Sequence, residues 1–141
     1  MPGPFTVDAS IFLSAFSPQE AGHAASRRFL ATLQDRVSPM VEPALLLPEL
    51  AGAISRRWQD ADLARRFASA IGRLPHLHLI PLEQRLARQA AALAAQHRLR
   101  GSDAVYAAVA RQFGATLVTL DEEQRSRLLR FLPARRPEDA G

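Results

Sequence analysis

Four acidic residues stand where the sequence changes from one local pattern to another. Asp8 and Asp121 each directly follow a short run of β-forming residues, and Glu49 and Asp103 fall in the first turns of helical patterns. In an open parallel sheet, the carboxyl ends of the strands and the amino ends of the following helices share one edge. The sequence therefore predicts that these four carboxylates gather on a single rim.

A rim of four carboxylates predicts a cation site. Two carboxylates about 4 Å apart repel by roughly 4 kcal/mol at an effective dielectric near 20. Either some are protonated or a divalent ion neutralises them. Oxygen ligands suit Mg²⁺ or Mn²⁺, and such an ion can activate water for phosphodiester hydrolysis. Taken singly, each acid also fits a helix N-cap or a solvated helix end, so the combination carries the prediction.

Short apolar strands alternate with helices along the chain, which predicts βαβ units and an open parallel sheet of the α/β class. The expected strands are Phe5–Asp8, Val37–Val41, Leu77–Ile80 and Thr116–Leu120. The expected helices are Ile11–Phe16, Glu20–Arg36, Pro43–Trp58, Asp60–Arg73, a segment from Pro81 to about His97, one from Gly101 that ends at Gly114, and one from Asp121 to Leu129.

Some positions carry more specific expectations. Ser102 suits the N-cap of its helix, and Phe113 continues an apolar stripe along that helix. Leu82 is expected to face inward from the preceding helix. Residues 1–132 are expected to form a single domain, and Pro133–Gly141 a loose tail.

Composition removes several classes of enzyme. All 18 basic residues are arginine, and there is no cysteine among the 141 residues. Thiol nucleophiles, cysteine zinc sites, Walker-A motifs and lysine Schiff bases are excluded. A net charge of +4 favours a polyanionic partner. No uncharged stretch is long enough for a membrane span, and the first residues lack a signal-peptide pattern, so a cytoplasmic protein is expected.

Four motifs together resemble those of the PIN-domain nucleases and, among them, the VapC-like toxins of toxin–antitoxin pairs. The motifs are Val7-Asp-Ala-Ser10, Leu47-Pro-Glu-Leu50, Arg100-Gly-Ser-Asp-Ala-Val-Tyr106 and Ala115-Thr-Leu-Val-Thr-Leu-Asp121. The resemblance spans about residues 5–132. It implies a three-layer α/β/α domain with four or five parallel strands, a Mg²⁺- or Mn²⁺-dependent endoribonuclease activity, a homodimer, and an antitoxin partner.

The resemblance also assigns roles to residues. Asp8, Asp103 and Asp121 match metal ligands, and Glu49 completes the catalytic set by orienting the attacking water or holding a second ion. Ser10 and Thr119 match the family's small hydroxyl positions, from which they would hydrogen-bond the carboxylates or a scissile phosphate oxygen. Glu123 matches a further acid. The sequence departs from the family in lacking an aromatic residue soon after Asp121.

Other interpretations remain open from the sequence. The same rim would suit a PIN-like module that binds RNA or a protein without cutting. Phospho-transfer through Asp8 is disfavoured, because related phospho-aspartate folds use a lysine. The Arg56-Arg57 pair fits either RNA phosphates or a solvated helix face. Tyr106, one turn after Asp103, is expected to serve packing rather than chemistry.

Overall fold

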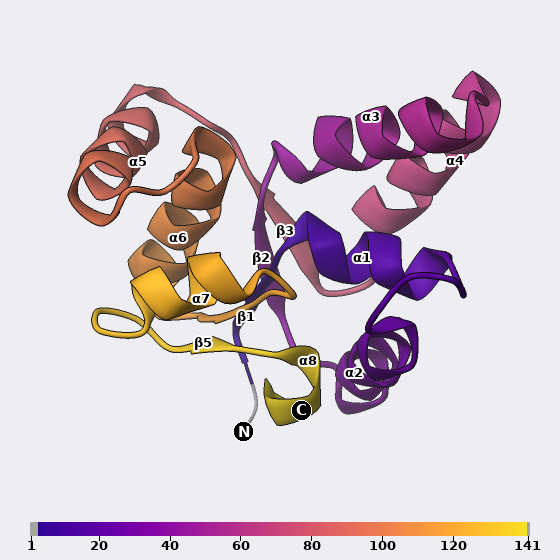
Figure 1. The fold of residues 1–141 in the computed structure, drawn as a ribbon, viewed down its shortest axis with the longest axis horizontal. Coiled ribbons are helices and arrows are strands. Elements are labelled where there is room, and N and C mark those ends of the chain that lie inside the picture. Colours follow the sequence, from indigo (N-terminus) through magenta and orange to yellow (C-terminus); the bar gives the residue numbers. More distant parts are fainter. Residues whose placement is uncertain (1–2, 141) are drawn as a thin grey trace.

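A parallel sheet forms the centre of the molecule (Figure 1). The computed structural model describes residues 3–140. Five strands lie in the order β3-β2-β1-β4-β5, and every adjacent pair is parallel. The sheet agrees with the predicted α/β class and number of strands. The strand bounds are β1 Phe5–Val7, β2 Met40–Pro43, β3 Leu77–Ile80, β4 Thr116–Val118 and β5 Ala134–Arg135.

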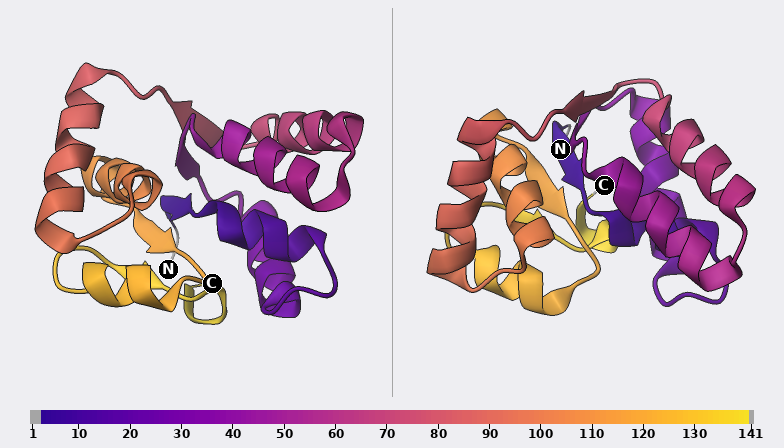
Figure 2. Two further views of the ribbon diagram at one scale, coloured as in Figure 1. Left: turned by 45° about the horizontal axis from the view of Figure 1, so that its top comes forward. Right: turned by 90° about the horizontal axis from the view of Figure 1, so that it is seen from above.

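Helices cover both faces of the sheet and make the three layers (Figures 1 and 2). Pairs of helices fill the first three crossovers, with α1 to α4 on one face and α5 and α6 on the other. This arrangement follows from right-handed crossovers, because the connection from β3 to β4 runs back across the sheet. The helices are α1 Ala9–Phe16, α2 His23–Arg36, α3 Leu46–Trp58, α4 Ala61–Gly72, α5 Gln84–His97, α6 Gly101–Phe113, α7 Glu122–Leu128 and α8 Pro137–Ala140.

Helix α6 is the most buried helix and packs against β1, β2 and β4. Half of its buried positions are alanine, which lets the helix axis come close to the sheet. The strands beneath it are largely buried, and Val7, Leu117 and Val118 have no exposed surface. This packing fixes the first turn of α6 beside the ends of β1 and β4.

The order in which the chain adds strands changes direction between β1 and β4. From β1 the chain goes on to β2 and β3 on one side, and from β4 it goes on to β5 on the other side. Ligands of open α/β sheets bind in the crevice at such a point, outside the carboxyl ends of the strands. The backbone N–H of Asp8 donates to the carbonyl of Val118 at 2.9 Å, which joins the two strand ends directly. The fold therefore provides a crevice where the sequence predicts the acidic rim.

Several local predictions are wrong. The second strand begins at Met40 rather than at residue 37, because Val37 adopts a left-handed conformation (φ 56°) that ends α2. Arg100, not Ser102, is the N-cap of α6. Leu82 and Phe113 are 48% and 40% exposed, respectively, since Leu82 precedes α5 and Phe113 lies at the last turn of α6.

The predicted loose tail is also corrected. Ala134 and Arg135 pair with Leu117 and Val118 as the fifth strand of the sheet. The short helix α8 follows and packs against α2. Within residues 3–140, no helix is long and apolar enough to cross a membrane.

Candidate active site at the ends of β1 and β4

The four predicted acids lie at one edge of the sheet. Asp8 directly follows β1, and Asp121 is the N-cap of α7, just after β4. Asp103 and Glu49 lie in the first turns of α6 and α3, respectively. Electrostatic repulsion from Asp103 and from Glu49 acts on Asp8, so the three carboxylates share one neighbourhood. The predicted rim is therefore present.

Asp8 is held by two hydroxyl groups from opposite sides. Ser10 donates to Asp8 Oδ2 at 2.7 Å, and the Thr119 hydroxyl lies 3.1 Å from the same oxygen. Burial raises the pKa of Asp8 to about 6, and Asp103 and Glu49 add to the rise, although both hydroxyls oppose it. The hydroxyls thus fix Oδ2, while within residues 3–140 no donor to Oδ1 is present.

The Thr119 hydroxyl connects β4 to α7. It accepts from the backbone N–H of Asp121 at 3.0 Å and lies 2.9 Å from Gln124 Oε1. A hydroxyl has one hydrogen, which cannot serve both Asp8 and Gln124 Oε1. Turning the Gln124 amide over would let Nε2, buried and unpartnered in the described chain, donate to Thr119. The hydroxyl hydrogen would then belong to Asp8.

Arg100 bridges the other two aspartates. Its Nε donates to Asp103 Oδ2 at 2.9 Å, and a terminal nitrogen donates to Asp121 Oδ2 at 2.5 Å. Burial raises the pKa of Asp103, while Arg100 lowers it. The Arg100 side chain itself is 74% exposed. A positive charge thus already sits between two of the predicted metal ligands, on a side chain that is free to move into solvent.

Glu49 is oriented by a residue that the sequence assigned to packing. The Tyr106 hydroxyl donates to Glu49 Oε1 at 2.6 Å, although the tyrosine has no exposed surface. Burial and the nearby carboxylate raise the pKa of Tyr106, so it stays protonated and remains a donor. Tyr106 therefore fixes one oxygen of Glu49 from beneath.

Glu42 is a fifth acid, buried beneath the rim. It lies on β2 with no exposed surface, and its Oε2 accepts from the Val7 backbone N–H at 2.7 Å. Its Oε1 is buried and has no partner in the described residues. Complete burial raises the pKa of Glu42 well above its usual range, and Asp8 raises it further. The side chain therefore favours the neutral acid.

The Glu42 side chain also replaces a backbone hydrogen bond that β1 and β2 do not make with each other. The register of β1 with β2 contains only the pair Phe5 and Met40. Beyond that pair, side chains join the strands: Thr6 donates to the Val41 carbonyl at 2.8 Å, and Glu42 receives the Val7 N–H. The position of Val7, and with it that of Asp8, depends on this buried carboxyl.

The donor set suits a divalent cation. The predicted ligands all offer carboxylate oxygens, as Mg²⁺ and Mn²⁺ prefer. Burial and neighbouring carboxylates raise the pKa of Asp8 and of Asp103, and the guanidinium of Arg100 binds Asp103, so added positive charge is favourable there. In the described part of the chain, no three acidic or histidine side chains are yet close enough for a metal cage. Closure around an ion would require Arg100 to release Asp103 and Asp121.

A family model for the PIN domain matches residues 5–127. The chain belongs to the PIN-domain family. The resemblance inferred from its four motifs is thereby confirmed. No curated protein matches the sequence significantly.

Solved structures share this PIN fold at low sequence identity. VapC20 from Mycobacterium tuberculosis, a toxin that cleaves the sarcin-ricin loop, gives a TM-score of 0.72 at 20% identity, over 86% of this chain and 93% of that one. FitAcB from Neisseria gonorrhoeae gives a TM-score of 0.70 at 17% identity. A toxin–antitoxin complex from Klebsiella pneumoniae gives a TM-score of 0.68 at 16% identity. Each covers 94% of this chain and 97% of the other. These likenesses confirm the three-layer fold.

The acids after Asp121 divide between the site and the surface. Glu123 lines a small pocket of about 180 Å³ with Asp103 and Asp121, but its carboxylate pairs with Arg127. Glu122 pairs with Arg125 and Arg136, which lower its pKa to about 2. The segment directly after Asp121 lacks an aromatic residue, and ion pairs of Glu122 and Glu123 with arginines hold it instead.

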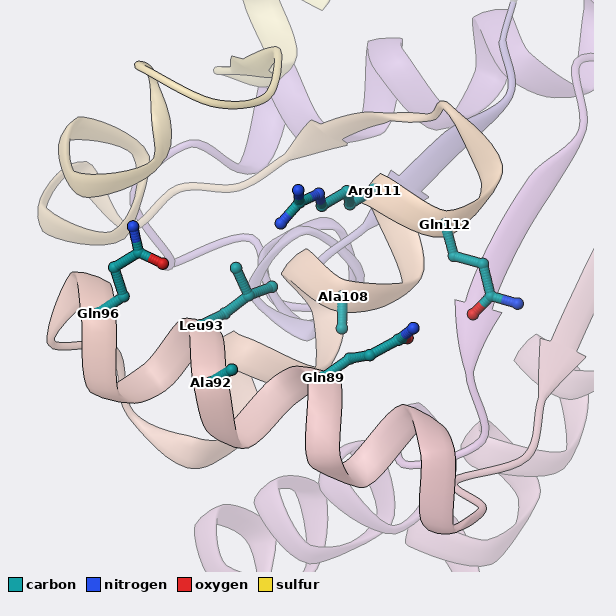
Figure 3. A pocket seen from close by; sticks show the side chains of 7 residues that line it. All are labelled: Gln89, Ala92, Leu93, Gln96, Ala108, Arg111 and Gln112. Carbon is teal, nitrogen blue, oxygen red and sulfur yellow. The ribbon is translucent and has the colours of Figure 1, made fainter.

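A larger pocket of this PIN domain lies away from the acids. It has a volume of about 450 Å³ and lies between α5 and α6 (Figure 3). Glutamines and Arg111 line it, with no carboxylate among its residues. Because it lacks acids, it offers none of the chemistry that the rim does.

Sequence reasoning missed four residues of the PIN-domain site. Arg100 and Tyr106 lie three residues before and after Asp103, so helical spacing placed both beside a predicted ligand. Gln124 lies three residues after the N-cap Asp121. Glu42 gave a weaker signal, a lone carboxylate in a buried strand, which is costly unless it serves a purpose.

Proposed function

We propose that this protein is a metal-dependent endoribonuclease that acts as the toxin of a toxin–antitoxin pair. The observation that carries the proposal is the placing of Asp8, Asp103, Asp121 and Glu49 around the crevice between β1 and β4. Membership of the PIN-domain family and the likeness to VapC20 support it.

Asp8, Asp103 and Asp121 would hold the ion. When bound, Mg²⁺ or Mn²⁺ supplies positive charge that polarises water and stabilises the charge developing on a phosphate. Ser10 and Thr119 orient Asp8 by holding its Oδ2, which leaves Oδ1 without a hydrogen-bond donor among the described residues. Such fixed carboxylates avoid a reorganisation cost when the substrate arrives.

Glu49 would orient the attacking water and receive its proton. Tyr106 fixes Oε1 of Glu49, which leaves Oε2 to accept a hydrogen bond from that water. Hydrolysis then forms one phosphorus–oxygen bond to the water oxygen and breaks one within the RNA backbone, whose leaving oxygen takes up a proton. Glu123, held by Arg127 at the edge of the crevice, has an auxiliary place at most.

The proposal extends to partners and location. The proposed partner is an antitoxin that covers the acidic rim, and the likeness to a toxin–antitoxin complex from Klebsiella pneumoniae supports it. The homodimer is proposed from the family resemblance alone. A cytoplasmic location agrees with an RNA substrate.

The test is RNA cleavage by the purified protein in Mn²⁺, in Mg²⁺ and in EDTA. We expect cleavage that requires the metal and that falls at least about a thousandfold in Asp8→Asn, because a central ligand loses its charge. Asp62→Asn is the matched control, since Asp62 is an exposed acid that pairs only with Arg65 and Arg66 on α4.

Two outcomes would contradict the proposal. Cleavage that survives equally in Asp8→Asn would remove the rim from the reaction. RNA binding without cleavage in any metal would instead favour a non-cleaving PIN-like module.

A further inference from the structure

A groove leads away from the acidic rim between α1 and α3, which lie side by side (Figure 2). Two adjoining hollows of about 420 and 350 Å³ form it, and both are lined by Leu13, Ala53 and Arg56. Glu49 lies in the first hollow and Trp58 in the second. The groove thus starts at a catalytic carboxylate and follows α3 for about 14 Å, at a rise of 1.5 Å per residue.

Arg56 is the cation of this groove without a partner. No ion pair or side-chain hydrogen bond involves Arg56 among the residues that the structure describes. A Cβ at Gly52 would lie 3.1 Å from a terminal nitrogen of Arg56, so the side chain lies back along the helix toward Glu49. The glycine leaves room for that position. Arg56 is seven residues from Glu49, two turns along the same face of α3.

Trp58 ends the groove with an exposed aromatic surface. It is 39% exposed, although Arg57 stands 4.9 Å from its ring and Phe16 packs against it nearly perpendicularly, at 5.4 Å. Arg57 is committed to an ion pair with Glu20. The indole is therefore held in place by its neighbours while part of it faces solvent.

We propose that this groove binds single-stranded RNA next to the cleaved bond, with a phosphate on Arg56 and a base stacked on Trp58. The inference rests on the proposed nuclease function and names a substrate site for it. Proteins that hold single strands without reading sequence combine cations for the phosphates with aromatic surfaces for the bases. Arg56 and Trp58 offer both here, in a groove whose other charges are Glu49 and the paired Glu20 and Arg57. The acidic rim repels phosphates, so a strand gains attraction at an unpaired cation such as Arg56, which lies in the same hollow as Glu49.

The tryptophan itself provides the test. Trp58 is the only tryptophan of the chain, so its fluorescence reports on this groove alone. The titration uses a decauridylate RNA in Mg²⁺ and the Asp8→Asn protein, because this substitution prevents cleavage. We expect saturable quenching, and an affinity about tenfold lower when Arg56→Gln is added. The affinity should also depend less steeply on salt. The slope of the logarithm of the binding constant against the logarithm of the salt concentration should be smaller in magnitude by about 0.7, for one lost phosphate contact.

Arg88→Gln is the matched control, because it removes the same charge from an exposed position on α5. Trp58→Ala and Trp58→Phe, followed by the anisotropy of a labelled RNA, separate stacking from charge. We expect about tenfold weaker binding with alanine and partial recovery with phenylalanine. In the cleaving protein, Arg56→Gln should raise KM and leave kcat unchanged.

The outcomes distinguish this inference from the proposed function. Equal RNA affinity in Arg56→Gln and Arg88→Gln, or unquenched Trp58 fluorescence at saturating RNA, overturns the groove even if the protein cleaves RNA. Quenching by an acidic decapeptide but not by RNA also overturns it and makes the groove a peptide site. Quenching by RNA in a protein that never cleaves supports the groove and contradicts the nuclease.

Discussion

The acidic rim has two halves that are built differently. The inner half consists of Asp8 with Ser10 and Thr119, and Glu42 beneath them; Asp8, the most exposed of its two acids, is only 8% exposed. The outer half consists of Asp103, which is as buried as Asp8, and Asp121, joined by the 74% exposed Arg100. The inner half is fixed by the sheet and by hydroxyl donors. The outer half is held by a cation that can leave.

This difference teaches how a cluster of like charges is kept stable in a fold. Where the carboxylates are buried, protonation and hydrogen bonds relieve the cost, as the raised pKa values of Asp8 and Glu42 indicate. In the outer half, an exposed arginine compensates the charge of both aspartates. An incoming metal ion must therefore compete with protons at Asp8 and with Arg100 at Asp103 and Asp121.

Glu42 gives the largest expected effect on stability. Glu42→Ala should lower the free energy of unfolding by about 3 kcal/mol, because it leaves a cavity and an unpaired Val7 N–H. Glu42→Gln should cost less than about 1 kcal/mol, because the amide resembles the neutral acid in shape and keeps an acceptor. Urea unfolding at pH 7 measures both. Equal losses in the two variants would show that Glu42 needs its charge, contrary to its role in the inner half.

Asp8 should make the stability depend on pH. Its pKa rises from 3.8 to about 6 on folding, so the native state binds more protons than the unfolded chain between these values. Stability should therefore fall as pH rises from about 4 to about 6, by at most about 3 kcal/mol from this group. Asp8→Asn should flatten that fall and be the more stable protein at pH 7. Thermal unfolding across this range in EDTA measures it, and identical profiles for the two proteins would contradict the burial of Asp8.

Arg100 gives a smaller effect and tests the outer half. Arg100→Gln should change stability in EDTA by less than about 1 kcal/mol, because its ion pairs are largely exposed. It should tighten Mn²⁺ binding several-fold, because the metal no longer displaces a guanidinium. Arg127→Gln, which removes an arginine from the same small pocket, is the control for overall charge. Calorimetry of Mn²⁺ binding gives the answer, and weaker binding in Arg100→Gln than in Arg127→Gln would mean that Arg100 assists the metal.

The sequence predicted the architecture well where local patterns were strong. Apolar runs located β1, β3 and β4 closely, and the acids after β1 and β4 were placed at the correct edge. β5 was missed because a strand of two residues, Ala134 and Arg135, is too short to show a periodic pattern. Its pairing with β4 is a long-range contact, which short sequence windows do not reveal.

The supporting residues of the site were harder to predict than its acids. Motif spacing identifies Asp8 and Asp103, because their role depends on where an element begins. The partners of these acids depend on which segments meet in space. Arg100 reaches Asp121, 21 residues away, and Tyr106 reaches Glu49, 57 residues away. Such contacts follow from the crossover of α6 beside β1 and β4, and only the assembled sheet shows them.

The central claim is that the two halves together form one divalent metal site. The most direct measurement is Mn²⁺ binding to the purified protein, followed by electron paramagnetic resonance of the free ion. The account predicts one Mn²⁺ per chain, with binding lost in Asp8→Asn from the inner half and in Asp103→Asn from the outer half, and unchanged in Asp62→Asn. Equal binding in all three variants, or no binding by the folded wild-type protein, would contradict it.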